Sequence, residues 1–131
     1  MNWGMNMAFS KTDSGRVWFL DLDGTIFVHN KYLSLEKDEL DELLPGALEF
    51  FSRVNNNDKI IIVSSRSDNF KEITIRSLKH YDIRYDYLLF NMPKGPRILI
   101  NDRKPDGTKT SYALNLTRNS PLNVPEKYFE I

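Results

Sequence analysis

Residues 17–25, VWFLDLDGT, are the stretch that decides the predicted fold. An apolar run rich in strand-forming residues stops at a turn sequence, a pattern typical of a buried parallel strand and its carboxyl end. Asp21 and Asp23 are two residues apart, so on a strand their side chains face the same way. Two carboxylates in one small site repel each other, and a cation offsets that repulsion. Because neither cysteine nor histidine lies near this pair, the oxygen ligands favour Mg²⁺ over zinc.

The rest of the chain alternates strand and helix patterns. Three more strands and two helices are predicted, at 59–63, 87–90, 97–100, 45–54 and 69–80, respectively. Such alternation predicts parallel βαβ units, and in open parallel sheets ligands bind beyond the carboxyl ends of the strands. The segments 21–23, 64–66 and 101–102, which follow three of these strands, are therefore expected to meet at one site.

Length and composition bound the kind of protein that this sequence encodes. The chain has 131 residues, 18 basic and 18 acidic side chains and no cysteine, which suits one globular domain. Zero net charge argues against binding nucleic acid or an anionic membrane through bulk charge. The absence of cysteine excludes disulfides and thiolate sites. No apolar run approaches the ~20 residues of a membrane helix, and no secretory signal is visible, so a cytoplasmic protein is expected.

Composition also divides the chain into three parts. Residues 1–15 are expected to form a loosely ordered arm, residues 16–120 an α/β core, and residues 121–131 a tail. Within the core, residues 26–44 are expected to form a short flap. The second half of this flap is acidic, which favours a solvated face.

Three segments resemble motifs of the haloacid dehalogenase (HAD) superfamily of phosphatases and phosphotransferases. Residues 19–26 (FLDLDGTI) resemble its first motif, residues 61–66 (IIVSSR) its second, and residues 98–106 (ILINDRKPD) its fourth. The resemblance covers about residues 16–110 and implies a single Rossmann-like domain with three layers around a parallel sheet. The fourth motif departs from the family pattern, because Asn101 stands where many members have another aspartate.

The resemblance implies a mechanism for the acidic residues. Asp21 would attack a phosphoryl group and form an aspartyl-phosphate. Asp23 would protonate the leaving alcohol and then activate water. Mg²⁺ would be held by Asp21, by Asp23 through its backbone carbonyl, and by Asp102, with support from Asp106. The implied protein is a phosphomonoesterase, a hydrolase.

The resemblance also implies phosphate contacts. Ser64 would bind phosphoryl oxygens, and a basic residue would neutralise their charge. Lys94 stands in the expected place for that base, and Arg97 and Lys104 compete with it. Further substrate contacts are assigned to the loops after the first two motif strands, at Gly24, Thr25, Ser65 and Arg66.

The chain is too short for the cap domain that members of this superfamily usually carry. It is therefore similar to capless members, whose open sites take large substrates or use a second subunit as a lid, so a homo-oligomer is one expectation. Its size also resembles that of phosphatase-like proteins of capsule and polysaccharide biosynthesis. The main functional hypothesis is hydrolysis of a phosphosugar or a related small phosphorylated metabolite.

Two other functions stay open. A non-catalytic module that binds a phospho-ligand or a partner protein would account for Asn101, but it leaves the pair of aspartates at 21 and 23 without a purpose. A nucleic-acid end phosphatase would suit an open site, and residues 94–109, with five bases and two acids, form a modest basic patch. The neutral net charge weighs against nucleic acid as the substrate.

Overall fold

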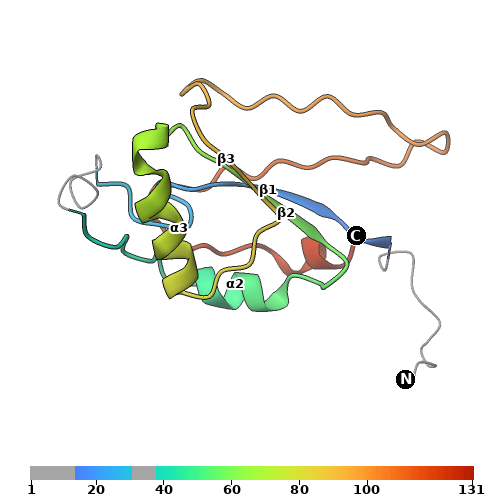
Figure 1. Ribbon diagram of the computed structural model, residues 1–131. Coiled ribbons are helices and arrows are strands. Elements are labelled where there is room, and N and C mark those ends of the chain that lie inside the picture. Colours follow the sequence, from blue (N-terminus) through green and yellow to red (C-terminus); the bar gives the residue numbers. More distant parts are fainter. Residues whose placement is uncertain (1–13, 31–37) are drawn as a thin grey trace.

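Three parallel strands form the centre of the computed structural model, which describes residues 14–30 and 38–131 (Figure 1). In sheet order they are β1 (Val17–Asp21), β2 (Lys59–Val63) and β3 (Tyr87–Leu89). These are the strands predicted at 17–20, 59–63 and 87–90, which are confirmed. Because the strands are parallel, their carboxyl ends lie at the same end of the sheet. The chain is thus a small α/β protein with an open parallel sheet.

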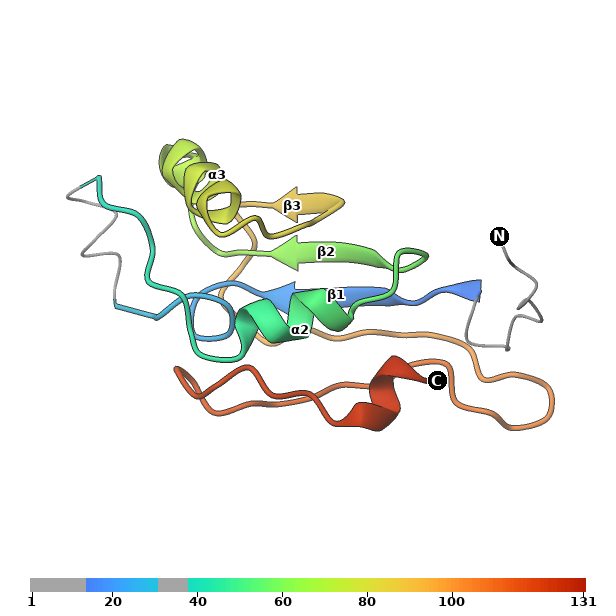
Figure 2. The ribbon, with the colours of Figure 1, turned by 90° about the horizontal axis from the view of Figure 1, so that it is seen from below.

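Two helices connect the strands and cover one face of the sheet (Figure 2). They are α2 (Ala47–Arg53) and α3 (Lys71–His80), and a 3₁₀ turn, η2 (Asp68–Phe70), precedes α3. The covered face is apolar, and side chains from the sheet and from both helices form one core cluster that includes Leu20, Ile60, Ile62, Ala47, Phe50 and Leu78.

The opposite face of the sheet carries no helix from the described residues. Val17, Phe19 and Tyr87 on this face are 55%, 57% and 61% exposed. The predicted three-layer arrangement is therefore wrong for this structure, which has two layers. Both helices pack on the same face, so the strands alternate between buried and exposed side chains instead of being buried on both faces.

Helix α2 begins two residues later than the predicted start at Pro45. Gly46 adopts a left-handed conformation with φ 83°, and a Cβ atom there would lie 2.7 Å from the backbone oxygen of Leu122. Leu122 is buried in the core, and its N–H donates to the carbonyl oxygen of Pro45 at 2.9 Å. A second 3₁₀ turn, η3 (Glu126–Phe129), packs its Phe129 ring 5.2 Å from the ring of Trp18. The segment predicted as a tail thus contributes to the core.

Residues 97–100, predicted as a fourth strand, form no strand. The two isoleucines of this segment are 83% and 90% exposed. The following turn folds the chain back on itself, because Lys104 N–H donates to Thr108 O at 3.0 Å and Gly107, at φ 92°, donates to Lys104 O at 2.8 Å. Turn chemistry at this Pro-Asp-Gly sequence takes precedence over pairing with the sheet. Residues 97–111, called the hairpin below, therefore run beside the sheet without joining it, and their turn lies beyond the amino ends of the strands (Figure 1).

Part of the predicted arm, residues 1–13, and part of the predicted flap, residues 31–37, lie outside the described residues. Within the described part of the chain, no helix has the length and apolar character needed to cross a bilayer.

Candidate active site

The loop after β1 closes tightly around the carbonyl group of Leu22. That oxygen accepts backbone hydrogen bonds from Ile26 at 3.0 Å and Phe27 at 3.1 Å. Gly24 makes the turn with φ 88°, a left-handed conformation that glycine adopts without strain. Asp21 is the last residue of β1 and Asp23 lies in the turn that follows. Both acidic residues are therefore at the carboxyl end of this strand.

Asp21, the predicted nucleophile, has 51% of its side chain exposed. Its Oδ1 atom lies 3.6 Å from Nη2 of Arg97. Partial burial raises the pKa of Asp21 above its ordinary value, and the positive charge of Arg97 opposes that rise. An accessible carboxylate beside a guanidinium group is suited to attack a phosphoryl group, because the cation stabilises the charge that phosphate brings.

Arg97 is thus the basic residue that the structure brings to Asp21. Lys94, the residue predicted for this role, is exposed. Among the described residues no ion pair joins Lys94 or Lys104 to Asp21, whereas Arg97 forms one. Of the three candidate bases, Arg97 is therefore the one that lies beside Asp21 in this structure, and the assignment of the phosphate-neutralising role stays a prediction.

Arg118 and Asn119 pack over the loop after β1, although no sequence pattern singles them out. The N–H of Asn119 donates to the carbonyl oxygen of Gly24 at 2.9 Å, and its Oδ1 atom accepts the N–H of His29 at 2.7 Å. The charge of Arg118 lowers the pKa of Asp21, as that of Arg97 does. Asp21 therefore has two guanidinium groups in its surroundings.

Asp23 is held by Arg66, whose side chain is only 1% exposed. Nε and Nη2 of Arg66 donate to the two carboxylate oxygens of Asp23 at 3.0 and 2.7 Å. The other guanidinium hydrogens go to Asp41 and Thr74. Every N–H group of the guanidinium is thus occupied. This differs from the predicted role of Arg66 as a substrate contact, because a buried guanidinium with all donors engaged has none left for substrate.

The structure also places the other predicted phosphate contacts. Ser64 follows β2 and is buried, with its Oγ atom accepting the N–H of Arg66 at 3.0 Å. Ser65 and Thr25 are half-buried in the loops after β2 and β1, next to the ends of these strands. Their contacts with phosphate, and that of Gly24, stay predictions.

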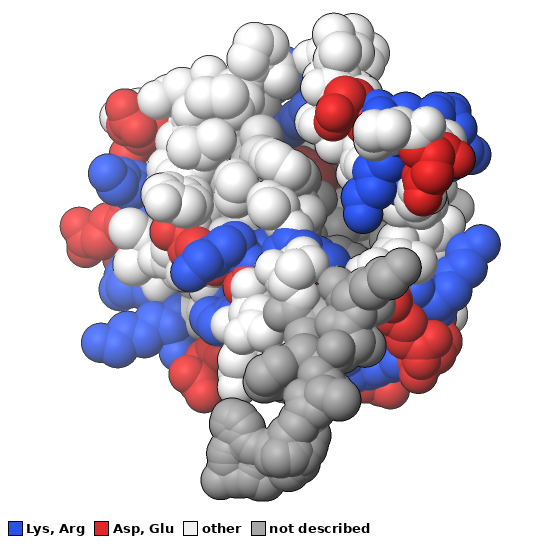
Figure 3. Space-filling model, turned by 90° about the vertical axis from the view of Figure 1, so that its right-hand side faces the viewer, with Lys and Arg blue, Asp and Glu red and all other residues white. Residues whose placement is uncertain are grey.

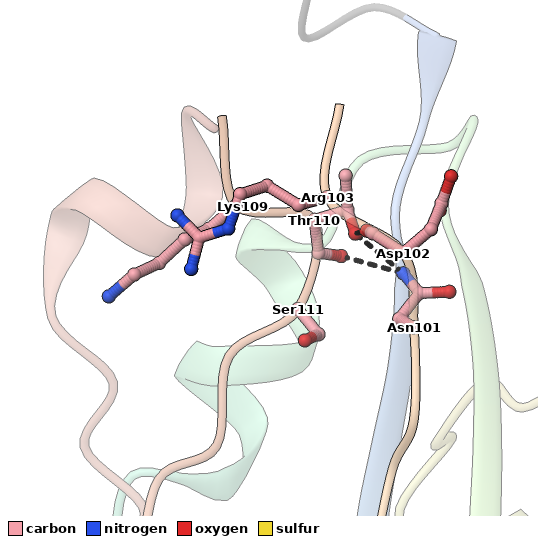
Figure 4. A pocket seen from close by; sticks show the side chains of 6 residues that line it. All are labelled: Asn101, Asp102, Arg103, Lys109, Thr110 and Ser111. Carbon is pink, nitrogen blue, oxygen red and sulfur yellow. Dashed lines mark hydrogen bonds between the residues drawn. The ribbon is translucent and has the colours of Figure 1, made fainter. Parts of the chain in front are cut away.

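Asp102 and Asp106, predicted as metal ligands, lie on the exposed hairpin. Figure 4 shows its two arms joined by Asn101, whose Nδ2 atom donates to Oγ1 of Thr110 at 2.8 Å. Among residues 14–30 and 38–131, no group of three or more His, Cys, Asp or Glu side chains is arranged to hold a metal ion. The residues therefore do not fit the predicted Mg²⁺ site in this structure, because the segment before Asp102 does not join the sheet.

Comparisons with known proteins find similar solved structures but no matching family model or curated protein. Two chains from solved structures are similar, one from "Structure of Pnkp1/Rnl/Hen1 complex" and one from "Structure of the Pnkp1/Rnl/Hen1 RNA repair complex". Each is 27% identical with a TM-score of 0.50, and the alignments cover 68% and 67% of this chain. They cover 32% and 29% of those chains, so this chain spans about a third of their length.

Proposed function

We propose that this protein is a phosphatase that removes a terminal phosphate from a nucleic-acid strand. The observation that carries the proposal is the half-exposed Asp21 carboxylate at the end of β1, 3.6 Å from the Arg97 guanidinium and beside Asp23. This is a nucleophile with a neighbouring charge-neutralising group and a neighbouring carboxyl group for proton transfer.

The chemistry follows from the positions of these three side chains. A carboxylate oxygen of Asp21 attacks phosphorus, and the bond from phosphorus to the leaving alcohol breaks as that oxygen takes a proton from Asp23. Water then attacks the aspartyl-phosphate, gives a proton to Asp23, and releases inorganic phosphate. The proton that Asp23 gains in the second step replaces the one it gave in the first, and Arg97 neutralises phosphate charge throughout.

Two observations support a nucleic-acid end over a small metabolite. The similar solved chains belong to an RNA repair complex. The hairpin and the loop before it carry a local excess of positive charge, with five bases and two acids over residues 94–109. The end of the hairpin, where Figure 3 shows charged side chains of both signs, lies beyond the amino ends of the strands, so it would contact a nucleic-acid strand away from its phosphorylated end. A local basic surface attracts a polyanion even when the whole chain is neutral.

Phosphate release from matched substrates tests the proposal. The panel contains RNA oligonucleotides phosphorylated at either end, a hexose phosphate and p-nitrophenyl phosphate, each with and without an added divalent cation. We expect kcat/KM for one of the oligonucleotides to exceed that for the hexose phosphate by at least about tenfold. A preference for the hexose phosphate would contradict the proposal and indicate a small phosphorylated metabolite as the substrate.

A non-catalytic module is the second candidate, because the predicted metal ligands Asp102 and Asp106 are not gathered at Asp21. It predicts that a folded protein releases no phosphate from any member of the panel. Binding of a phosphorylated oligonucleotide without turnover would then be the remaining activity.

Arg97 and Lys94 form a matched pair for a second prediction. Arg97→Ala should lower kcat/KM by about a hundredfold, because it removes the charge nearest the reacting phosphate. Lys94→Ala should change it by less than about threefold, since an exposed lysine contributes only screened attraction. Steady-state kinetics on the preferred substrate checks both variants. A larger loss in Lys94→Ala would transfer the role to Lys94.

A further inference from the structure

A buried cluster joins the site to the flap. Asp41 belongs to the acidic half of the flap, yet it is 3% exposed. Its Oδ1 and Oδ2 atoms accept hydrogen bonds from Nη2 and Nη1 of Arg66 at 2.7 and 3.0 Å. The same guanidinium holds both oxygens of Asp23. One arginine thus makes two forked ion pairs, with a carboxylate of the site and a carboxylate of the flap.

The flap side of this cluster is itself anchored. The N–H of Asp41 donates to Oγ of Ser77 at 2.9 Å, and its carbonyl oxygen accepts the hydroxyl of Tyr81 at 2.6 Å. Ser77 lies on α3 and Tyr81 follows its last residue. Thr74 on the same helix accepts a hydrogen bond from Nη1 of Arg66 at 2.7 Å. Asp41 therefore has a fixed backbone as well as a fixed carboxylate.

The two ends of the flap are also tied together. Val28 N–H donates to the carbonyl oxygen of Glu42, and Leu44 N–H donates to that of Ile26, both at 2.9 Å. The flap thus leaves and re-enters the core at one place, and Asp41 lies next to this base. Asp41 and Asp23 share the guanidinium of Arg66, so the position of Asp41 helps to fix the group that holds Asp23.

We propose that Asp41 and Arg66 are positioning residues that hold the Asp23 carboxylate for proton transfer. The inference rests on the proposed phosphatase function. Both Asp23 oxygens are fixed in the plane of the Arg66 fork, and Arg66 in turn is fixed by Asp41 and Thr74. Loss of Asp41 leaves one side of the guanidinium without its partner and frees Asp23 to turn with it.

The test uses two leaving groups that need the proton of Asp23 to different degrees. An oligonucleotide alcohol must be protonated as it leaves, whereas p-nitrophenolate leaves as an anion. We compare Asp41→Asn with Glu42→Gln, the same chemical change at the adjacent exposed residue. Single-turnover release of alcohol and the burst of p-nitrophenolate report the first step for each substrate, and KM is measured alongside.

We expect Asp41→Asn to slow the first step about tenfold with the oligonucleotide and less than about twofold with p-nitrophenyl phosphate, at unchanged KM. Glu42→Gln should alter neither rate. Equal slowing with both substrates would show a general structural role for Asp41 and overturn the proposal, as would no slowing with either.

Inactivity of the wild type on every substrate would contradict the proposed function. The contact of Asp23 with Asp41 through Arg66 is then tested without an activity assay. Equilibrium unfolding of Asp23→Asn, Asp41→Asn and the double variant forms a mutant cycle. Non-additive changes are expected because both carboxylates share Arg66. Additive changes would overturn the link between flap and site.

Discussion

Replacing Asp21 with asparagine should lower phosphate release by at least about a thousandfold, because the amide cannot act as the nucleophile. The carboxylate is half exposed, and so is Arg97, with which it forms an ion pair. The substitution therefore removes reactivity with little loss of packing. Release of inorganic phosphate from the preferred substrate, measured beside far-ultraviolet circular dichroism, checks both parts of this expectation.

Asp82→Asn is the matched control for Asp21→Asn. Asp82 is exposed and adopts φ 56°, a left-handed conformation that asparagine also accepts. Its activity should equal that of the wild type. Full activity in Asp21→Asn would reject Asp21 as nucleophile, and equal losses in both variants would point to a general effect of charge.

The raised pKa of Asp21 predicts how Asp21→Asn changes stability with pH. Because the folded state holds this proton more firmly than the unfolded chain, the favourable contribution is fully present below the unfolded pKa of about 3.9. This contribution is lost as pH rises through the pKa of Asp21 in the folded protein. Asparagine does not ionise, so the variant escapes this loss. The free energy of unfolding of Asp21→Asn minus that of the wild type should therefore be larger at pH 7 than at pH 3, by less than about 1 kcal/mol for a half-exposed group. Urea unfolding at both pH values measures the difference, and a larger relative gain at pH 3 would contradict it.

Replacing Arg66 with methionine should destabilise the fold by about 3–5 kcal/mol, the largest stability effect that we expect. The change removes the only described cation paired with Asp23 and Asp41 and leaves two carboxylates, 12% and 3% exposed, without its charge. Chemical unfolding at neutral pH measures the loss.

Arg76→Met is the control for Arg66→Met. Arg76 forms an ion pair with Asp38 at 2.7 Å, the same distance as in the Arg66 pairs, but both side chains are exposed. Solvent screening should limit its loss to about 1 kcal/mol or less. If Arg66→Met costs no more than Arg76→Met, the buried cluster does not stabilise the fold.

Much of the sheet could be predicted from the sequence because short apolar runs ended at turn residues. The strands at 17–20, 59–63 and 87–90 had this pattern, and parallel pairing followed from the helices between them. The run at 97–100 had the same pattern and forms no strand. Its outcome depends on the turn at residues 104–108, whose backbone bonds close the hairpin locally. A pattern of apolar residues does not reveal which of two pairings prevails.

The candidate site was predictable in part for a related reason. Asp21 and Asp23 stand out because they follow a strand directly. Asp41 does not, since it lies in an acidic run whose other charges favour a solvated face, and its burial depends on tertiary contacts with Arg66, Ser77 and Tyr81. Arg118 comes from a distant segment and reaches the loop through tertiary packing. Contacts of this kind leave no periodic or local signal in the sequence.

The most direct test of Asp21 as the nucleophile is transfer of phosphate to the protein itself. The wild type is mixed with an oligonucleotide that carries a radioactive terminal phosphate and is quenched in acid within one turnover, and the protein is then separated and counted. We expect a label on the protein that neutral hydroxylamine releases, as expected of an acyl phosphate, and no label on Asp21→Asn. Rapid release of phosphate with no labelled protein at any quench time, or an equal label on Asp21→Asn, would contradict this role of Asp21.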